Sequence, residues 1–331
     1  MRLDVNTRSI LVCGGAGYIG SHMVRLLIER GLDVTVFDNL STGHAQAVGS
    51  ARLVEGDVLD AAALDALLGG QRFDAVMHFC ALSLVGESVR RPLAYYRNNV
   101  FGSLNLVEAM QRHGVDRLVF SSTAAIFGEP QQARIDETHP AAPINPYGHS
   151  KWMVEQILRD AAQASGLRSV ALRYFNAAGA SPSGQIGESH DPETHLIPNI
   201  LKSALAGGAG LKVFGDDYST PDGTCVRDYI HVDDLARAHL AALDWMDQHP
   251  GAHAFNLGNG QGFSVLEVIE AARRVTGQPI PYTIEPRRAG DPATLVAGAE
   301  LARQCLGWVQ EYRDIEEIIE TAWRWHRAAA Y

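Results

Sequence analysis

Lysine is scarce in this chain of 331 residues: of 28 basic residues only three are lysines, namely Lys151, Lys202 and Lys212. The chain carries 38 acidic residues, so its formal net charge is −10 and it has no general attraction for nucleic acid or an anionic membrane. Any phosphate group must therefore be bound at a local site. Neither nucleic acid nor a membrane is an expected partner.

Cysteines and long hydrophobic runs are also few. The four cysteines lie far apart without a C-x-x-C pair, in a chain too large to need disulfides, so we expect them to be reduced and mostly buried. The apolar run at 10–13 is too short for a signal peptide, and no stretch approaches a transmembrane helix in length. These absences favour the cytoplasm. A hydrophobic fraction of 46% excludes a disordered or fibrous protein.

Short β-branched runs alternate with segments of helical periodicity in the first half of the chain. The expected strands cover 9–13, 33–37, 52–54, 75–79, 117–121 and 168–174. The expected helices cover 18–30, 60–68, 92–113 and 147–165. This repetition predicts an α/β fold with a doubly wound parallel sheet of the Rossmann type.

The alternation loosens from about residue 176. An irregular loop is expected over 177–194, followed by a strand over 226–231 and a helix over 232–245. Further on, Ser264 and Glu267 form a capping-box pattern, and Asp314 precedes a helix whose apolar stripe is Ile315, Ile318, Ile319 and Ala322. We therefore expect a dinucleotide-binding domain over 1–176 and a smaller, mixed α/β substrate lobe over 177–331. The boundary is approximate, and some elements are expected to interleave.

The glycine-rich string GGAGYIG at 14–20 is the first chemical signal. It follows an expected strand and opens an expected helix, and Asp38 ends the next strand 18 residues after Gly20. In this context the glycines let the backbone approach a pyrophosphate, while the acid binds the adenosine ribose. Because Asp38 would repel a 2′-phosphate, the cofactor predicted is NAD rather than NADP.

Tyr147 and Lys151 are the second signal, because residues four apart on a helix share one face. A tyrosine phenol has a pKa near 10 in water, and a neighbouring ammonium and a positive nicotinamide ring would both lower it. Such a phenolate can act as a general base. Ser121, Ser122 and Thr123, at the end of an expected strand, offer a hydroxyl to the same substrate oxygen.

The segment ESHDPETH at 188–195 brings His190, Asp191, Glu193 and His195 close in sequence. We expect no metal there, because a helical i,i+4 histidine pair is absent, Pro192 breaks the segment and no cysteine is near. A substrate-covering loop is the favoured interpretation.

Strings along the whole chain together resemble the UDP-glucose 4-epimerase family of the extended short-chain dehydrogenase/reductase superfamily. The resemblance rests on GGAGYIGSH, HFCALSLVGESV, YYRNNVFGSLNL, FSSTAAIFG, YGHSK, RYFNAAGA, PETHLIPNI, VFGDDYSTPDGTCVRDYIHVDDLA and EPRRAGDP. The glycine loop and Y-x-x-x-K belong to the whole superfamily, whereas the later strings are more specific.

The resemblance implies a role for individual positions. Tyr147 would be the catalytic base, Thr123 its hydroxyl partner, and Lys151 would hold the nicotinamide ribose. The positions matched to cofactor binding are Gly14, Gly17, Tyr18, Ile19, Gly20, Asp38, Asn39, Asp57, Asn99 and Lys151. The positions matched to substrate contacts are Thr123, Tyr147, Asn176, His195, Arg227, Arg288, Asp291 and Leu295.

Three positions depart from the family pattern, and a fourth bears on substrate range. Ser83 stands where some members have lysine, His195 replaces a common asparagine, and Gly298 lies where aspartate is frequent. Leu295 falls at a position that acts in the family as a gate to the sugar pocket. A tyrosine there crowds the 2-position of the sugar, and smaller residues accompany acceptance of N-acetylhexosamines. A leucine that merely packs against the second lobe is the alternative interpretation.

The implied activity is the NAD-dependent interconversion of UDP-glucose and UDP-galactose, with a UDP-sugar as partner. It would proceed by oxidation at C4, rotation of the 4-keto sugar and return of the hydride. The family also implies a homodimer formed by the helices near 92–113 and 147–165. Four alternatives stay open: a 4-epimerase for UDP-N-acetylglucosamine or a UDP-pentose, a nucleotide-sugar dehydratase or decarboxylase, a net-redox dehydrogenase, and a non-catalytic NAD-binding regulator.

Overall fold

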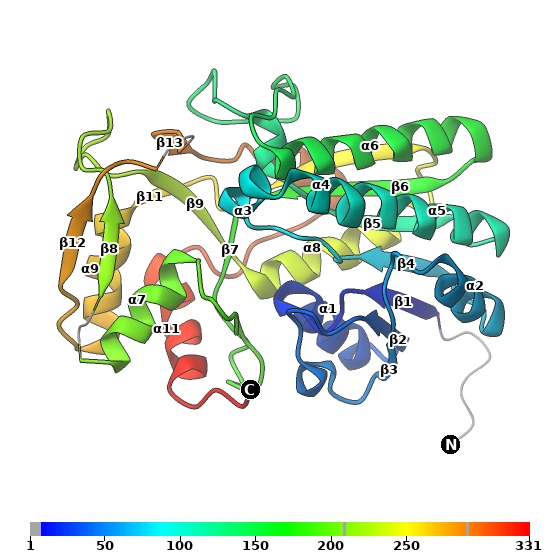
Figure 1. Cartoon of the computed structure of the whole chain (residues 1–331), viewed down its shortest axis with the longest axis horizontal. Coiled ribbons are helices and arrows are strands. Elements are labelled where there is room, and N and C mark those ends of the chain that lie inside the picture. Colours follow the sequence, from blue (N-terminus) through cyan, green and yellow to red (C-terminus); the bar gives the residue numbers. More distant parts are fainter. Residues whose placement is uncertain (1–7, 208–209, 289–290) are drawn as a thin grey trace.

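The computed structural model describes residues 8–207, 210–288 and 291–331, and its largest element is a seven-stranded sheet (Figure 1). All neighbouring strands in it are parallel. In sheet order they are β10 (Ala252–Leu257), β6 (Arg168–Tyr174), β5 (Arg117–Thr123), β4 (Ala75–His78), β1 (Ser9–Cys13), β2 (Asp33–Asp38) and β3 (Arg52–Glu55). The six strands predicted in the first half are confirmed. The chain order reverses between β1 and β4, and open α/β sheets bind ligands at such a switch point.

Helices cover both faces of this sheet because its strands carry apolar side chains on both sides. In β1, Ile10 and Val12 belong to one buried cluster, whereas Leu11 and Cys13 belong to the other. The first face is covered by α1 (Tyr18–Glu29) and α8 (Val232–Trp245), and the second by α2 (Ala61–Gly70), α5 (Gly102–Arg112) and α6 (Pro146–Ser165). The predicted doubly wound arrangement is confirmed.

The helical segment expected over 92–113 is confirmed, and it contains a π-helical stretch. It consists of α4 (Pro92–Tyr95), the π-helical segment η2 (Tyr96–Phe101) and α5. The wide π turn includes Asn99, whose buried amide accepts a hydrogen bond from the backbone N of Leu82 (2.8 Å) and donates one to its O (2.9 Å). The π turn itself could not be predicted, because side-chain periodicity hardly differs across a single wide turn.

The second lobe is built around β9 (Val226–His231) and lies beside the large sheet in Figure 1. Its strand β9 pairs antiparallel with β11 (Gly262–Ser264) and parallel with β7 (Asn176–Ala178) and β13 (Thr294–Leu295). A separate pair joins β8 (Leu211–Phe214) to β12 (Tyr282–Glu285) in parallel. Three helices share one apolar core in this lobe: α7 (Leu196–Leu205), α9 (Val265–Thr276) and α11 (Ile315–His326). The mixed α/β lobe is confirmed.

Two predicted helix starts are confirmed in this lobe. Ser264 and Glu267 form a complete capping box at α9, and Asp314 caps α11 by accepting a hydrogen bond from the backbone N of Glu316. The predicted stripe of α11 is buried in the core.

The chain crosses between the lobes after residue 176. Strand β10 and helix α8 return to the large sheet, and Ala302 of α10 (Glu300–Leu306) joins the core on its first face. The remaining helical segments are η1 (Ala45–Val48), α3 (Val85–Arg90) and η3 (Ala124–Phe127). Both lobes are therefore fixed to each other by shared elements.

The cysteines are free, as expected, and only Cys305 is exposed. Across the described ranges, no helix combines the length and the apolar character that crossing a bilayer requires.

Candidate active site

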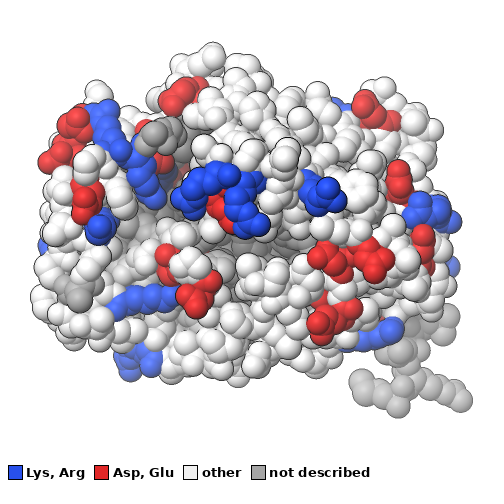
Figure 2. All heavy atoms as spheres, in the orientation of Figure 1, with Lys and Arg blue, Asp and Glu red and all other residues white. Residues whose placement is uncertain are grey.

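A cavity of about 420 Å³ opens at the carboxyl ends of the parallel strands. One side of it is lined by residues at the ends of four parallel strands. These are Gly14 after β1, Phe79 after β4, Thr123 at the end of β5 and Tyr174 at the end of β6. Arg227 of β9 lines the other side, so both lobes form the cavity. In Figure 2 charged side chains stand in small separate groups around a hollow in the middle of this face. The cavity therefore lies where the switch point of the sheet predicts a ligand.

The glycine loop forms a cradle at the start of α1. A Cβ on Gly14 would lie 2.7 Å from the backbone N of Cys80, and one on Gly20 would lie 2.1 Å from the O of Gly14. Gly17 caps α1 without a side-chain hydrogen bond, and a Cβ there would have only the O of Gly14 near it, at 3.5 Å. The loop therefore leaves open space at a helix N-terminus, where unpaired N–H groups bind a pyrophosphate. Gly14, Gly17, Tyr18, Ile19 and Gly20 all line the cavity.

The acidic positions matched to the adenosine end lie beside the cavity rather than in its lining. Buried Asp38 accepts hydrogen bonds from the backbone N of Ala16 and of Leu40, both at 2.9 Å, and so ties the glycine loop to the end of β2. Asn39 donates to Asp57 across 2.9 Å. These residues keep acceptors next to the glycine loop, as a ribose would require.

The structure brings Tyr147, Lys151 and Thr123 together in the lining of the cavity. Helix α6 begins at Pro146, and its N-cap Asn145 accepts a hydrogen bond from the backbone N of Gly148 (2.9 Å). Tyr147 and Lys151 therefore sit in the first turns of α6. Thr123, the last residue of β5, faces them.

Burial controls the protonation of this group. It lowers the pKa of Lys151 to about 7, although the ammonium lies 2.8 Å from the backbone O of Ser121 and 4.8 Å above the ring of Phe120. Burial also raises the pKa of Tyr147, and a hydrogen bond to Thr123 offsets this only in part. The protein's own groups therefore do not produce the predicted net lowering of the Tyr147 pKa, because the penalty of desolvating a phenolate is larger than the effect of this hydrogen bond; the lowering by a bound nicotinamide ring stays a prediction.

The positions matched to the substrate lie mainly on the second lobe. Asn176 of β7 and Leu295 of β13 line the cavity, and Leu295 pairs with Arg227 in the sheet register. Asp291 lies between two guanidinium groups, 3.8 Å from Arg227 and 3.2 Å from Arg288. Arg227 and Asp291 line the cavity, whereas Arg288 is exposed beside it. Ala289 and Gly290 of the RRAGD string lie outside the described residues.

Asn99 and Gly298 also lie outside the cavity lining. The side-chain amide of Asn99 is hydrogen-bonded to the backbone of Leu82 and donates to the Ser150 hydroxyl, 3.0 Å away. It therefore supports the loop from which Ser83 enters the cavity lining. Gly298 packs against Asp136 instead of facing the cavity.

Sequence reasoning missed two tyrosines. Tyr174 and Tyr229 line the cavity, and the Tyr174 hydroxyl is hydrogen-bonded to Ser121. Burial raises the pKa of both, so they stay protonated donors. Their place near the carboxyl ends of expected strands was a signal that could have identified them.

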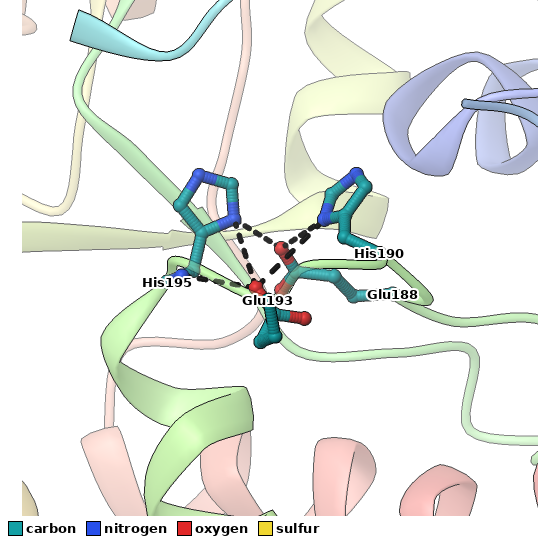
Figure 3. A group of neighbouring side chains, drawn as sticks. All are labelled: Glu188, His190, Glu193 and His195. Atoms are coloured by element: carbon teal, nitrogen blue, oxygen red, sulfur yellow. Dashed lines mark hydrogen bonds and ion pairs between the residues drawn. The ribbon is translucent and has the colours of Figure 1, made fainter. Parts of the chain in front are cut away.

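The acidic and histidine side chains of 188–195 converge although no helix holds them. Donor atoms of Glu188, His190, Glu193 and His195 all lie within 4.8 Å of one another (Figure 3). Asp191 is exposed and outside this group. Both histidines line the cavity. We call these four side chains the His/Glu cluster.

Comparisons with known proteins agree with this geometry. The family described as NAD dependent epimerase/dehydratase matches residues 10–258. The chain is 54% identical to a UDP-glucose 4-epimerase of Lacticaseibacillus casei over 319 residues, 96% of each chain. The UDP-glucose 4-epimerase of Brucella ovis, solved with NAD, superposes with a TM-score of 0.93 at 48% identity, covering 96% of this chain and 98% of that one. That of Bifidobacterium longum, solved with NAD⁺ and UDP, gives 0.93 at 41% identity, covering 97% and 98%.

Proposed function

The chain belongs to the NAD dependent epimerase/dehydratase family, and from this premise we propose how its cavity works as an NAD-dependent enzyme that interconverts UDP-glucose and UDP-galactose. One observation carries the proposal most strongly. Tyr147, Lys151 and Thr123 face the same cavity as the glycine cradle and Arg227. A general base, a dinucleotide site and a cation for a diphosphate are the parts that oxidation at C4 of a UDP-hexose needs.

Each side chain then has a task. Tyr147 takes the proton of the 4-hydroxyl, Thr123 hydrogen-bonds the same oxygen, and Lys151 holds the ribose next to the nicotinamide. NAD, when bound, would supply the hydride acceptor for oxidation at C4 and a positive charge that favours the phenolate of Tyr147. Arg227 and Arg288 hold the diphosphate while the hexose turns.

The rival chemistries lack supporting residues. A dehydratase needs an acid beside the hydroxyl, whereas Ala124 and Ala125 follow Thr123 in the lining. A non-catalytic regulator would have no need of the tyrosine and lysine pair.

We expect purified protein to convert UDP-galactose to UDP-glucose without added NAD, and to release close to one NAD per chain on denaturation. A hydride held between two half-reactions would be lost if the cofactor left, so retention follows from the closed cycle. Chromatographic identification of the product sugar and of the released dinucleotide tests both points. Accumulation of NADH with a keto sugar would instead indicate a net-redox dehydrogenase, and a lack of product would refute the proposed function.

Leu295 predicts the substrate range. Its side chain lines the cavity and is shorter than a tyrosine, so we expect some activity on UDP-N-acetylglucosamine beside UDP-glucose. Leu295→Tyr should then reduce kcat/KM for the acetylated sugar by about tenfold more than for UDP-glucose, the scale of a small steric change in a pocket. Leu295→Met, which keeps the volume similar, is the matched control. If Leu295→Tyr lowers kcat/KM equally for both substrates, Leu295 only packs against the second lobe and does not select the sugar.

We propose that two chains pair through α3, α4, η2 and α6. Exposed apolar side chains gather on these packed elements: Val89 (63% exposed), Leu93 (80%), Phe101 (48%) and Met153 (44%). Such a set is typical of an interaction surface. The homodimer, like a cytoplasmic location and a part in galactose metabolism, is also what the family resemblance implies.

Leu93→Asp is expected to raise the dimer dissociation constant at least about tenfold, because it buries a charge at the centre of the proposed interface. Val309→Asp, at a position 66% exposed outside this surface, is the matched control and should leave the dimer intact. Light scattering over a dilution series measures both. If the Leu93→Asp protein dissociates at the same concentration as the wild type, the interface lies elsewhere.

A further inference from the structure

The His/Glu cluster has the composition and arrangement of a metal site. Both imidazoles turn the same atom, Nδ1, toward the two carboxylates (Figure 3). The Nδ1 of His190 lies 3.2 Å from Glu188 and 3.9 Å from Glu193, and the Nδ1 of His195 lies 3.9 Å from Glu193 and in closer contact with Glu188. Each nitrogen therefore faces both carboxylates, and the four donor atoms all lie within 4.8 Å of one another.

The distances fit a small divalent ion. Ligands of tetrahedral Zn²⁺ lie at about 2.0–2.2 Å from the metal, which separates neighbouring ligand atoms by about 3.3 Å. Three of the four nitrogen–oxygen separations are 3.2–3.9 Å. Small side-chain rotations would therefore bring these atoms to the spacing of tetrahedral ligands. Two imidazoles and two carboxylates are borderline and hard donors of the kind that Zn²⁺ and its first-row neighbours accept. With neutral imidazoles, the two carboxylate charges would balance one dication.

The ligands are held by groups distant in sequence. The backbone O of Glu188 accepts a hydrogen bond from the indole of Trp325 (2.9 Å), and its side chain is 3% exposed. His195 is the N-cap residue of α7. Glu193 accepts backbone hydrogen bonds from Thr194 (2.8 Å) and His195 (2.9 Å), which fix its carboxylate. The cluster is thus organised before any ion binds.

Glu193 also carries acceptor capacity that the described protein does not use. Its side chain is 4% exposed, and its Oε2 has no hydrogen-bond partner among the described residues. The nearest cation is the ammonium of Lys202, 3.6 Å away. The Oε1 of the same carboxylate faces both histidines, and a divalent ion bound there would neutralise the buried charge that the two oxygens share.

We propose that Glu188, His190, Glu193 and His195 form a Zn²⁺ site with four protein ligands. Closed four-ligand sites are structural, so the ion would clamp the 188–195 segment to the first turn of α7 and fix one wall of the cavity. It would take no part in the hydride chemistry. The inference does not depend on the proposed function.

The test is titration of chelator-treated, tag-free protein with Zn²⁺ alone, in competition with a chromophoric chelator. All proteins carry Cys305→Ser, because that exposed thiol is itself a metal ligand. We expect one ion per chain, and affinity at least about tenfold weaker in His190→Gln and in Glu193→Gln. The matched control is His113→Gln, which removes a surface histidine 3.1 Å from the carboxylate of Asp65.

The thermal midpoint gives a second readout. Saturating Zn²⁺ should raise the Tm of the parent protein and of the His113 variant, and raise it much less in the two cluster variants. Less than one ion per chain, or unchanged affinity in the cluster variants, would overturn the proposal. An equal loss in His113→Gln would overturn it too.

Discussion

Tyr147→Phe is expected to lower turnover of UDP-galactose at least about 10²-fold, the usual scale for removing a general base. The fold and the affinity for UDP should change little. The ring keeps its edge contact with Tyr95, whose centroid lies 6.5 Å away, and the arginines proposed to hold the diphosphate lie on the other lobe. Turnover, and the Kd of UDP by calorimetry, separate the lost proton transfer from lost binding.

Thr123→Val is the comparison variant. In the proposed mechanism Thr123 would donate or accept a hydrogen bond at the reacting oxygen without taking its proton, so a smaller loss of turnover is expected. The change also removes the hydrogen bond from the backbone N of Ala125 to the Thr123 hydroxyl (3.1 Å), so stability is measured alongside. Near-normal turnover of Tyr147→Phe would exclude Tyr147 as the base.

The large sheet was predictable because its signals are local. Buried parallel strands are continuous apolar runs, and each lies between a helix end and the next helix start, so β1 and β6 match their expected bounds. The short strands β7, β11 and β13 have two or three residues and exist only because β9 pairs with them. No periodicity can appear in so few residues. The return of β10 to the large sheet was equally unpredictable, because it depends on the long-range pairing of β10 with β6.

The candidate site divides in the same way. Tyr147 with Lys151 and the glycine loop are short motifs on one helix or one turn, so their spacing reports their geometry. The pKa of Tyr147 does not follow from spacing, because it depends on how deeply the folded chain buries the phenol. The convergence of the His/Glu cluster could not be predicted for a related reason. Helical spacing is a local signal, whereas here an irregular segment anchored by Trp325 brings the four side chains together.

The second large effect is expected in stability. Glu155→Ala should lower the free energy of unfolding by about 3–5 kcal/mol, the cost of leaving a buried charge without its partner. Glu155 of α6 is bound by Arg173 of β6 at 3.0 and 2.6 Å, and by the Ser122 hydroxyl of β5 at 2.6 Å. Its side chain is 2% exposed and that of Arg173 is 7% exposed. Urea denaturation at neutral pH measures the change, and Glu155→Gln serves if the alanine variant does not fold.

The matched control is Asp116→Ala, which breaks the ion pair with Arg168 at the start of the same strand β6. That contact is also 2.6 Å long, but its side chains are 25% and 49% exposed, so about 1 kcal/mol or less is expected. The double change Glu155→Met with Arg173→Met should recover much of the loss, because no unpaired charge then stays buried. The buried pair holds α6, with Tyr147 and Lys151, against β6, and the Ser122 hydrogen bond holds it against β5, the strand that ends in Thr123. If Glu155→Ala costs no more than Asp116→Ala, the pair does not hold α6 in place, and the packing of apolar residues such as Val154 and Leu158 must do so alone.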